Sequence, residues 1–154
     1  MATGDIVLFD EFAETGHKGM DLSADVIKLA IIDDTVTPSN TDTTPMWVVG
    51  SGVDYDGNEV STAGGYTANG ETLTYAGVTR WNQSGGTCTF DADNVALVQN
   101  LAGFTDAYWG ILYNDTSTNK DAIGYVEMGG PVSEAAGPIT FAWNASGLLQ
   151  VAVP

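Results

Sequence analysis

The chain has 154 residues, of which 44% are hydrophobic, and this length and composition predict one domain over residues 1–154 with a single core. Four Lys and Arg residues against twenty Asp and Glu residues give a formal net charge of −16. That balance argues against nucleic-acid binding, which relies on Lys and Arg to displace counterions from phosphates. No apolar run approaches the roughly 18 residues of a membrane span, and the amino end lacks a secretory leader pattern. We therefore expect a soluble protein with no membrane partner and no secretory processing.

The acidic residues are scattered along the chain rather than gathered in one tail. Such a surface keeps a protein soluble without specifying what it binds. Three interpretations stay open: a merely acidic soluble domain, a protein on the outside of a larger assembly, and a protein from a saline habitat.

Short runs of β-branched, aromatic and aliphatic residues between turn signals predict strands along the whole chain. In chain order we expect strands at residues 6–9, 25–32, 71–78, 87–90, 108–114, 122–129, 139–144 and 148–153, with a short apolar piece at 46–49. In the second strand, alternation directs Ile27, Leu29 and Ile31 inward and Lys28 outward. Asn69-Gly70 predicts a tight turn. Residues 11–20 and 91–101 are read either as short helices or as loops.

Strands at this spacing, without helices between them, predict an all-β fold. The expected architecture is a single-domain antiparallel β-sandwich, jelly-roll-like, with at most one or two short helices. Period-two alternation places these residues in the core: Ile27, Leu29, Ile31, Leu73, Phe90, Ile111, Ile123, Phe141, Trp143, Leu149 and Val151.

Carboxylates give the candidates for metal binding. Residues 54–59 (DYDGNE) place Asp54 and Asp56 beside a Gly that would turn a calcium loop, but the twelve-residue spacing with its distal Glu is missing. An Asp-Gly turn explains the same residues. Asp33-Asp34 and Asp91 with Asp93 are possible ligands or acid/base pairs, yet twenty acids make such pairs expected by chance.

Other reactive groups give no catalytic pattern. His17 has no second histidine for zinc and no nucleophile elbow near it in sequence. Cys88 alternates with Phe90 and is read as a small buried hydrophobe rather than a reactive thiol. We predict no catalytic residue, no cofactor and no metal ligand, and therefore no enzyme.

Asparagines and tryptophans complete the candidates. The sequons at Asn82, Asn114 and Asn144 are read as turn chemistry. Trp109 and Trp143 are expected in the core. Trp47 and Trp81 lie at strand ends and are candidate exposed anchors for a ligand or a partner.

The order of several segments resembles small β-rich virion structural proteins of tailed double-stranded DNA bacteriophages. The resemblance covers most of the chain, and it rests on residues 21–30 followed by a loop with Pro38, then 65–74 (GYTANGETLT), 90–95 (FDADNV), 109–115 (WGILYND), 123–125 and 141–149 (FAWNASGLL).

This resemblance implies a non-enzymatic head decoration or cement protein on the exterior of the capsid, present in the host cytoplasm during assembly. Its expected partners are the major capsid protein and other copies of itself, most simply as a trimer. Residues 1–5 or the loop 38–45 are candidate attachment segments, because either would add a strand to a capsid edge. Two alternatives remain: a tail-tip or fibre-associated protein that binds host glycan or another tail protein, and a glycan hydrolase with paired carboxylates.

Overall fold

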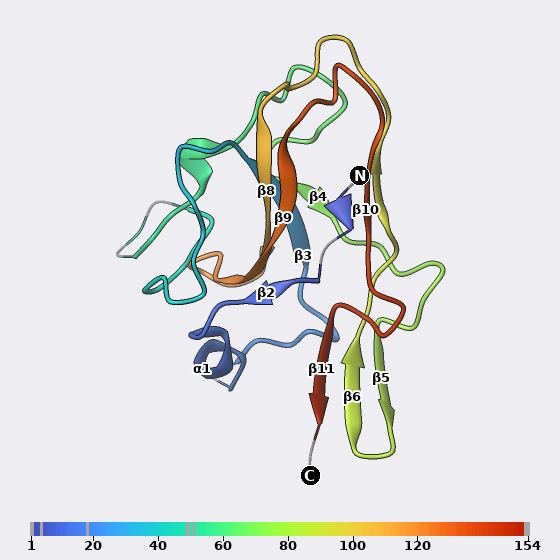
Figure 1. Ribbon diagram of the computed structural model, residues 1–154. Helices are drawn as coiled ribbons and strands as arrows, with labels where there is room; N and C mark the ends of the chain where they lie inside the picture. The colour runs from blue at the N-terminus through green and yellow to red at the C-terminus, as the bar shows by residue number, and fades with distance from the viewer. Residues whose placement is uncertain (1, 4, 18, 49, 51, 153–154) are drawn as a thin grey trace.

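The computed structural model describes the chain except for residues 1, 4, 18, 49, 51 and 153–154 (Figure 1). Its described residues form eleven strands, one short α-helix and one 3-10 turn. The elements are β1 (Ala2–Thr3), β2 (Val7–Leu8), α1 (Phe12–His17), β3 (Ile27–Ile32), η1 (Asp56–Asn58), β4 (Glu71–Thr72), β5 (Trp81–Ser84), β6 (Thr87–Phe90), β7 (Val95–Leu97), β8 (Ala107–Asn114), β9 (Ala122–Val132), β10 (Ile139–Ala142) and β11 (Leu149–Ala152).

A five-stranded antiparallel sheet in the order β2-β9-β8-β3-β4 forms the centre of the molecule. Both of its faces are buried. Ile27, Leu29 and Ile31 of β3 belong to one core, and Ala30 and Ile32 belong to a second core on the opposite face. The nearly continuous apolar sequence of β3 is typical of a strand covered on both sides.

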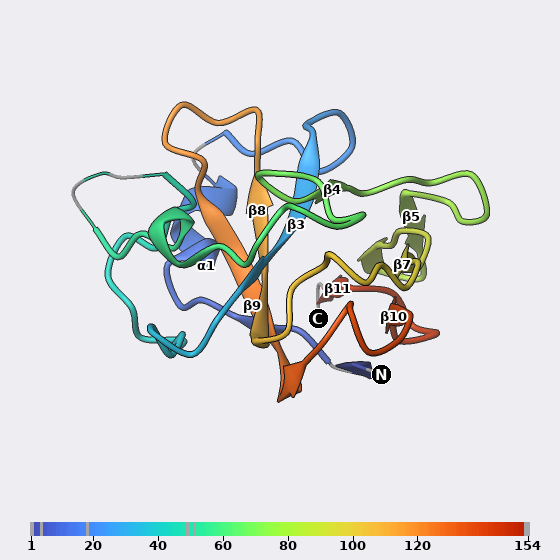
Figure 2. The same ribbon diagram turned by 90° about the horizontal axis from the view of Figure 1, so that it is seen from above.

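Two three-stranded sheets complete the fold, in the orders β1-β10-β7 and β11-β6-β5. Phe141 of β10 and Phe90 of β6 join the core that contains Ile27 and Leu29, so both small sheets contribute to one face of the central sheet. In Figures 1 and 2 the small sheets lie to one side of β3, β8 and β9, and β5, β6 and β11 extend away from the body. The all-β sandwich expectation is confirmed, whereas the jelly-roll connection stays a prediction.

Residues 36–48 and 52–60 cover the other face, and these described parts of the chain contain no named strand. Trp47 stacks on Tyr113 with ring centroids 5.3 Å apart, and Phe9 stacks on Tyr55 at 5.9 Å. The loop 38–45 is held by Asp42, whose Oδ2 accepts hydrogen bonds from the Tyr55 hydroxyl (2.7 Å) and the Ser39 amide (2.9 Å). This loop is therefore part of the second core layer rather than a loose appendage.

The predicted core is largely confirmed. Nine of the eleven residues are buried, from Ile27 to Leu149. Trp143 is only partly buried, with its indole N–H donating to the Asp93 carbonyl at 2.9 Å. Val151 is 49% exposed, so its placement in the core was wrong. Alternation gave the correct face of β11, but β11 continues beyond the part of the body that could cover it.

Three local predictions need correction. The expected strand 71–78 ends at Thr72, because the Asp93 carboxylate accepts hydrogen bonds from the Ala76 and Gly77 amides and turns the backbone away from a neighbouring strand. Residues 91–101, read as helix or loop, contain β7 with Val95 and Leu97 buried. The strand β5 was missed because all four of its residues are exposed and none alternates in polarity.

The tight turn predicted at Asn69-Gly70 is confirmed. Asn69 and Gly70 have φ values of 62° and 86°. Gly85 and Gly86, with φ values of 59° and 82°, form the two-residue connection between β5 and β6, where the left-handed conformation favours glycine. Of the two alternatives for residues 11–20, helix or loop, the structure contains a helix, α1.

The amino-terminal segment lies against its own domain where the structure describes it. Ala2 and Thr3 pair in parallel with Phe141 and Ala142 of β10, and Asp5 accepts a hydrogen bond from the Asn144 side chain at 3.0 Å. An attachment role for residues 1–5 would require this strand to leave β10.

Glu134 is a fully buried acid held among glycines. Its Oε1 accepts a hydrogen bond from the Gly65 amide at 2.8 Å, while its Oε2 has no hydrogen-bond partner within the described residues. A Cβ atom added at Gly103 would lie 2.7 Å from the carboxylate carbon and 2.9 Å from the Asn100 carbonyl oxygen. Only glycine at position 103 leaves room for this carboxylate.

We expect Phe141→Ala to lower the free energy of unfolding by about 3–5 kcal/mol, because the ring is 1% exposed and a cavity would remain. Val98→Ala is the control, since Val98 is 80% exposed and truncating an exposed valine changes stability by about 0.5 kcal/mol or less. Urea denaturation followed by tryptophan fluorescence measures both. Equal losses for the two variants would contradict the assigned core.

We expect Gly103→Ala to destabilise the fold by about 1–3 kcal/mol through overpacking against Glu134. Gly137→Ala is the matched control, because a Cβ added there meets nothing within 4 Å, and its stability should stay within about 1 kcal/mol of the wild type. Thermal denaturation of the two variants compares them directly. A Gly103→Ala protein as stable as the control would show that the glycine cradle is not tight.

Candidate functional site

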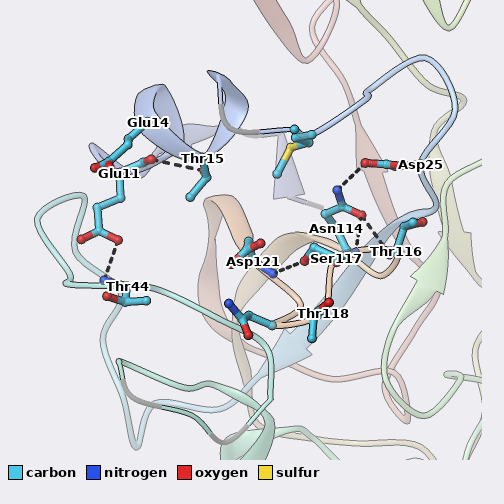
Figure 3. Close-up of a pocket in the computed structure, with 13 residues that line it drawn as sticks. Glu11, Glu14, Thr15, Asp25, Thr44, Asn114, Thr116, Ser117, Thr118 and Asp121 are labelled. Carbon is cyan, nitrogen blue, oxygen red and sulfur yellow. Dashed lines mark hydrogen bonds between the residues drawn. The ribbon is translucent and has the colours of Figure 1, made fainter.

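Two concave regions lie on opposite sides of α1. The first is a polar pocket of about 650 Å³ between α1, the Thr44 region and the loop 115–121 (Figure 3). Its lining carries four carboxylates, from Glu11, Glu14, Asp25 and Asp121. The second is a mainly apolar groove of about 630 Å³ between α1, residues 20–23 and the sheet β11-β6-β5.

Asn114, at the end of β8, organises the polar pocket. This buried side chain donates from Nδ2 to Asp25 Oδ2 at 2.7 Å, and its Oδ1 accepts from the Thr116 amide at 2.9 Å. Ser117 then links back through its hydroxyl to the Asp121 amide at 2.8 Å. These bonds fix the loop 115–121 against a segment some ninety residues earlier in the chain. Sequence reasoning missed this cluster because the participating residues are distant in sequence.

Two of the four lining carboxylates, those of Glu11 and Asp25, accept hydrogen bonds that hold loops. Glu11 Oε2 accepts from the Thr44 amide at 2.7 Å. Asp115 forms ion pairs with Lys120 at 2.7 Å and Lys28 at 3.4 Å. Burial acts to raise the pKa of Asp115, but the hydrogen bonds and charges of these two lysines outweigh it and lower the pKa below its usual range. Hydrogen bonds and ion pairs that hold the surrounding loops therefore explain much of the polarity of this pocket.

Asp54 and Asp56, the calcium candidates, lie on either side of Tyr55. Asp54 bridges to Met46, and Asp56 begins η1, whose amide and carbonyl groups close a tight turn over Gly57 and Asn58. Asp56 Oδ1 is buried without a hydrogen-bond partner within the described residues. No cluster of three or more His, Cys, Asp or Glu side chains suited to a metal ion occurs in the described part of the chain. The Asp-Gly turn accounts for this segment.

The other acidic candidates serve backbone geometry. Asp33 Oδ1 accepts from the Thr35 amide at 2.8 Å, and Asp91 Oδ1 accepts from the Ala92 amide at 2.9 Å. Asp93 accepts hydrogen bonds from the Gly77 and Ala76 amides and from the Thr74 hydroxyl. These bonds lower the pKa of Asp93, and the bond from Gly77 has the largest effect. The side chain of His17 lies outside the described residues.

The sequons behave differently from one another. Asn114 and Asn144 form the expected turns, with the Asn144 Oδ1 accepting from the Ser146 amide at 2.9 Å. Asn82 lies within β5, so its assignment to a turn was wrong. Cys88 is partly buried in β6.

The two candidate tryptophan anchors separate in the structure. Trp47 is 1% exposed and packs in the second core, so its expected exposure was wrong. Trp81 is 37% exposed and lines the apolar groove. Arg80, which precedes Trp81, donates to the carbonyl oxygens of Leu22 and Asp25. These bonds hold the start of β5 against the segment that contains Leu22, which lines the opposite wall of the groove.

Charge is distributed unevenly over the fold. None of the residues in β1, β5, β6, β7, β10 and β11 is charged, although the chain carries 24 charged residues in total. Among the described residues that line the apolar groove, Asp21 is the one charged side chain. The acids lie instead in α1, η1, β4, β9 and the loops, including Asp91 and Asp93 in the connection between β6 and β7. The charge-poor side is defined here as the strands of the two small sheets together with the apolar groove, and the acidic side as the central sheet with its loops.

Comparisons with protein-family models, with curated proteins and with solved structures find no match to this chain. No helix in the described part of the chain is long and apolar enough to cross a membrane.

We expect Asp93→Asn to destabilise the protein at neutral pH, because an amide cannot accept three hydrogen bonds as a carboxylate does. Since the folded state lowers the pKa of Asp93, its contribution is present above the unfolded value of 3.8 and is lost as the pH falls through the folded value. The difference in melting temperature between variant and wild type should therefore be largest near pH 7 and shrink towards about pH 2. Asp34→Asn, on an exposed aspartate, is the control. A pH-independent difference would contradict this role.

Proposed function

We propose that this chain is a non-enzymatic structural protein of a bacteriophage particle, which decorates the outside of the capsid and stabilises it. The observation that carries the proposal is the division between a charge-poor side and an acidic side. A decoration protein needs an uncharged side for contacts with neighbouring subunits and a side that remains hydrated in solvent. The resemblance in segment order to small virion proteins of tailed phages is the reason for proposing a phage particle as the larger assembly.

The acidic side supports an exterior position. A net charge of −16 repels packaged DNA, so such a protein gains nothing from contact with the contents of the head. The major capsid protein is the proposed partner, with no nucleic acid and no membrane involved. A symmetric oligomer, proposed as a trimer, would engage several capsid subunits at once and gain avidity.

The engagement of carboxylates in loop hydrogen bonds supports a non-enzymatic role. Glu11, Asp33, Asp42, Asp91 and Asp93 each accept from backbone amides. A glycosidase instead requires two carboxylates held about 5–10 Å apart over a bound sugar. This use of the acids makes the hydrolase alternative the weakest of the three.

The runner-up function is a tail-tip or fibre-associated protein that binds host glycan. One observation favours it: Trp81 is partly exposed at the edge of a groove, where an aromatic ring can stack on a sugar. Against it, the polar pocket with its hydroxyl and carboxyl groups contains no aromatic ring among its described lining residues.

The test is to locate the protein on purified particles by electron microscopy and to delete its gene from the phage that encodes it. We expect many copies on the head exterior, with contacts that bury well over about 1,000 Å² per copy. Particles without the protein should assemble but release DNA at a lower temperature, and adding purified protein should restore the resistance. A few copies confined to the tail, or binding to host polysaccharide without binding to capsids, would overturn the proposal and favour the runner-up.

A further inference from the structure

The sheet β11-β6-β5 has an apolar face that the molecule covers only in part. Strand pairing places Trp81, Phe90 and Leu149 in one row across the sheet. Gln83, Cys88 and Val151 form the next row on the same face, because side chains two residues apart share a face. We call this second row the overhang face.

The two rows have different surroundings. Phe90 and Leu149 belong to the main core, whereas Val151 is 49% exposed and Gln83 is exposed. Figure 1 shows the reason, since β5, β6 and β11 continue beyond the central sheet towards the carboxyl terminus. Across the apolar groove, Leu8, Phe12 and Leu22 face the sheet without filling the space between.

The sequence of this sheet is patterned for burial. In β6 and β11, Cys88, Phe90, Leu149 and Val151 alternate with Thr87, Thr89 and Gln150. A strand with one apolar and one polar face normally buries the apolar one. β5 and β11 are also the two edges of this sheet among the described strands, and edges with unpaired backbone groups are ready to receive another chain.

Charge indicates which molecule covers this face. Two copies of a chain with a net charge of −16 repel each other, and any carboxylate on a shared surface meets carboxylates of the other copy. A different partner could offer lysines or arginines to an acidic contact, but an identical copy offers the same sign. Self-association of this chain therefore favours a contact with few charges. Residues 81–90 and 144–152 contain no charged residue, and Asp21 is the one charged side chain among the described residues that line the groove.

We propose that the overhang face and the adjoining apolar groove form the surface through which this chain binds a second copy of itself. Val151 and Trp81 lie at its centre, and Asp21 is the one acid among its described lining residues. This proposal rests on the proposed function for its purpose, because copies that touch one another hold a shell together better than isolated copies.

Sedimentation velocity of the full chain tests the surface directly, with a reductant present so that Cys88 cannot cross-link. We expect a concentration-dependent oligomer. Its dissociation constant should fall as sodium chloride is raised from about 0.01 M to 1 M, because salt screens the repulsion between acidic copies. A contact with a basic surface would weaken under the same change.

Val151→Glu should raise the dissociation constant by about 30-fold or more, since it adds a carboxylate to a contact in which Asp21 is the one charged side chain among the described lining residues. Gln83→Glu, a change of similar size on an exposed residue of the same face, should have the same effect without loss of folding. Val26→Glu is the matched control: Val26 is 43% exposed but lies outside this surface, and the dissociation constant should change by about threefold or less. Circular dichroism confirms that each variant is folded.

A wild-type chain that stays monomeric up to about 1 mM overturns the proposal, as does equal weakening by Val26→Glu and Val151→Glu. Binding to capsids is measured separately by co-sedimentation with particles that lack the protein. Capsid binding by a strictly monomeric wild type would refute this surface and leave the proposed function standing. Self-association through this face without capsid binding would support the surface and refute the proposed function.

Discussion

The fold depends on burying both faces of β3 and β8 in a chain with almost no helix. One face is covered by the small sheets, but the other is covered by residues 36–48 and 52–60, which form no extended ladder where the structure describes them. Such segments expose backbone amides that need acceptors if they are to pack against a core. Side-chain carboxylates supply many of these acceptors. Within these segments, Asp42 accepts from the Ser39 amide at 2.9 Å and Glu11 accepts from the Thr44 amide at 2.7 Å. In the loop that follows them, Glu59 accepts from the Asn69 amide and Glu71 from the Thr67 amide, each at 2.7 Å. The high acid content thus has an internal role as well as a surface one.

The predictions from sequence succeeded for strands with local patterns and failed where a strand depends on distant contacts or has no hydrophobic pattern. Strands with clear alternation or continuous apolar runs, such as β3, β8 and β10, were predicted because their patterns are local. The short length of β4 was not, since it depends on Asp93, which lies about twenty residues further along the chain. β5 escaped detection because a fully exposed strand carries no hydrophobic period. Its existence follows from the Gly85-Gly86 turn, which returns β5 onto β6.

The site was harder to predict than the fold for the same physical reason. Alternation correctly assigned Cys88, Phe90, Leu149 and Val151 to one face, but it could not show where the rest of the molecule stops covering that face. The burial of Trp47 depends on its stacking with Tyr113, a contact between residues far apart in sequence. The Asp25 and Asn114 cluster likewise joins distant segments. A polar residue at the end of an apolar strand, as in Asn114, is the one local signal that could have indicated it.

The buried position of Asn114 also has a practical consequence for producing this protein. Asn114-Asp115-Thr116 is an acceptor sequence for N-linked glycosylation in a eukaryotic secretory pathway. A sugar attached to Nδ2 would replace one of the two hydrogens on the nitrogen that donates to Asp25, and it would need space where Asn114 is 1% exposed. Modification before folding is therefore incompatible with the β8 end and the loop that follows it. Expression in a bacterial cytoplasm, where this modification is absent, avoids the conflict that the chain would meet in a secretory host.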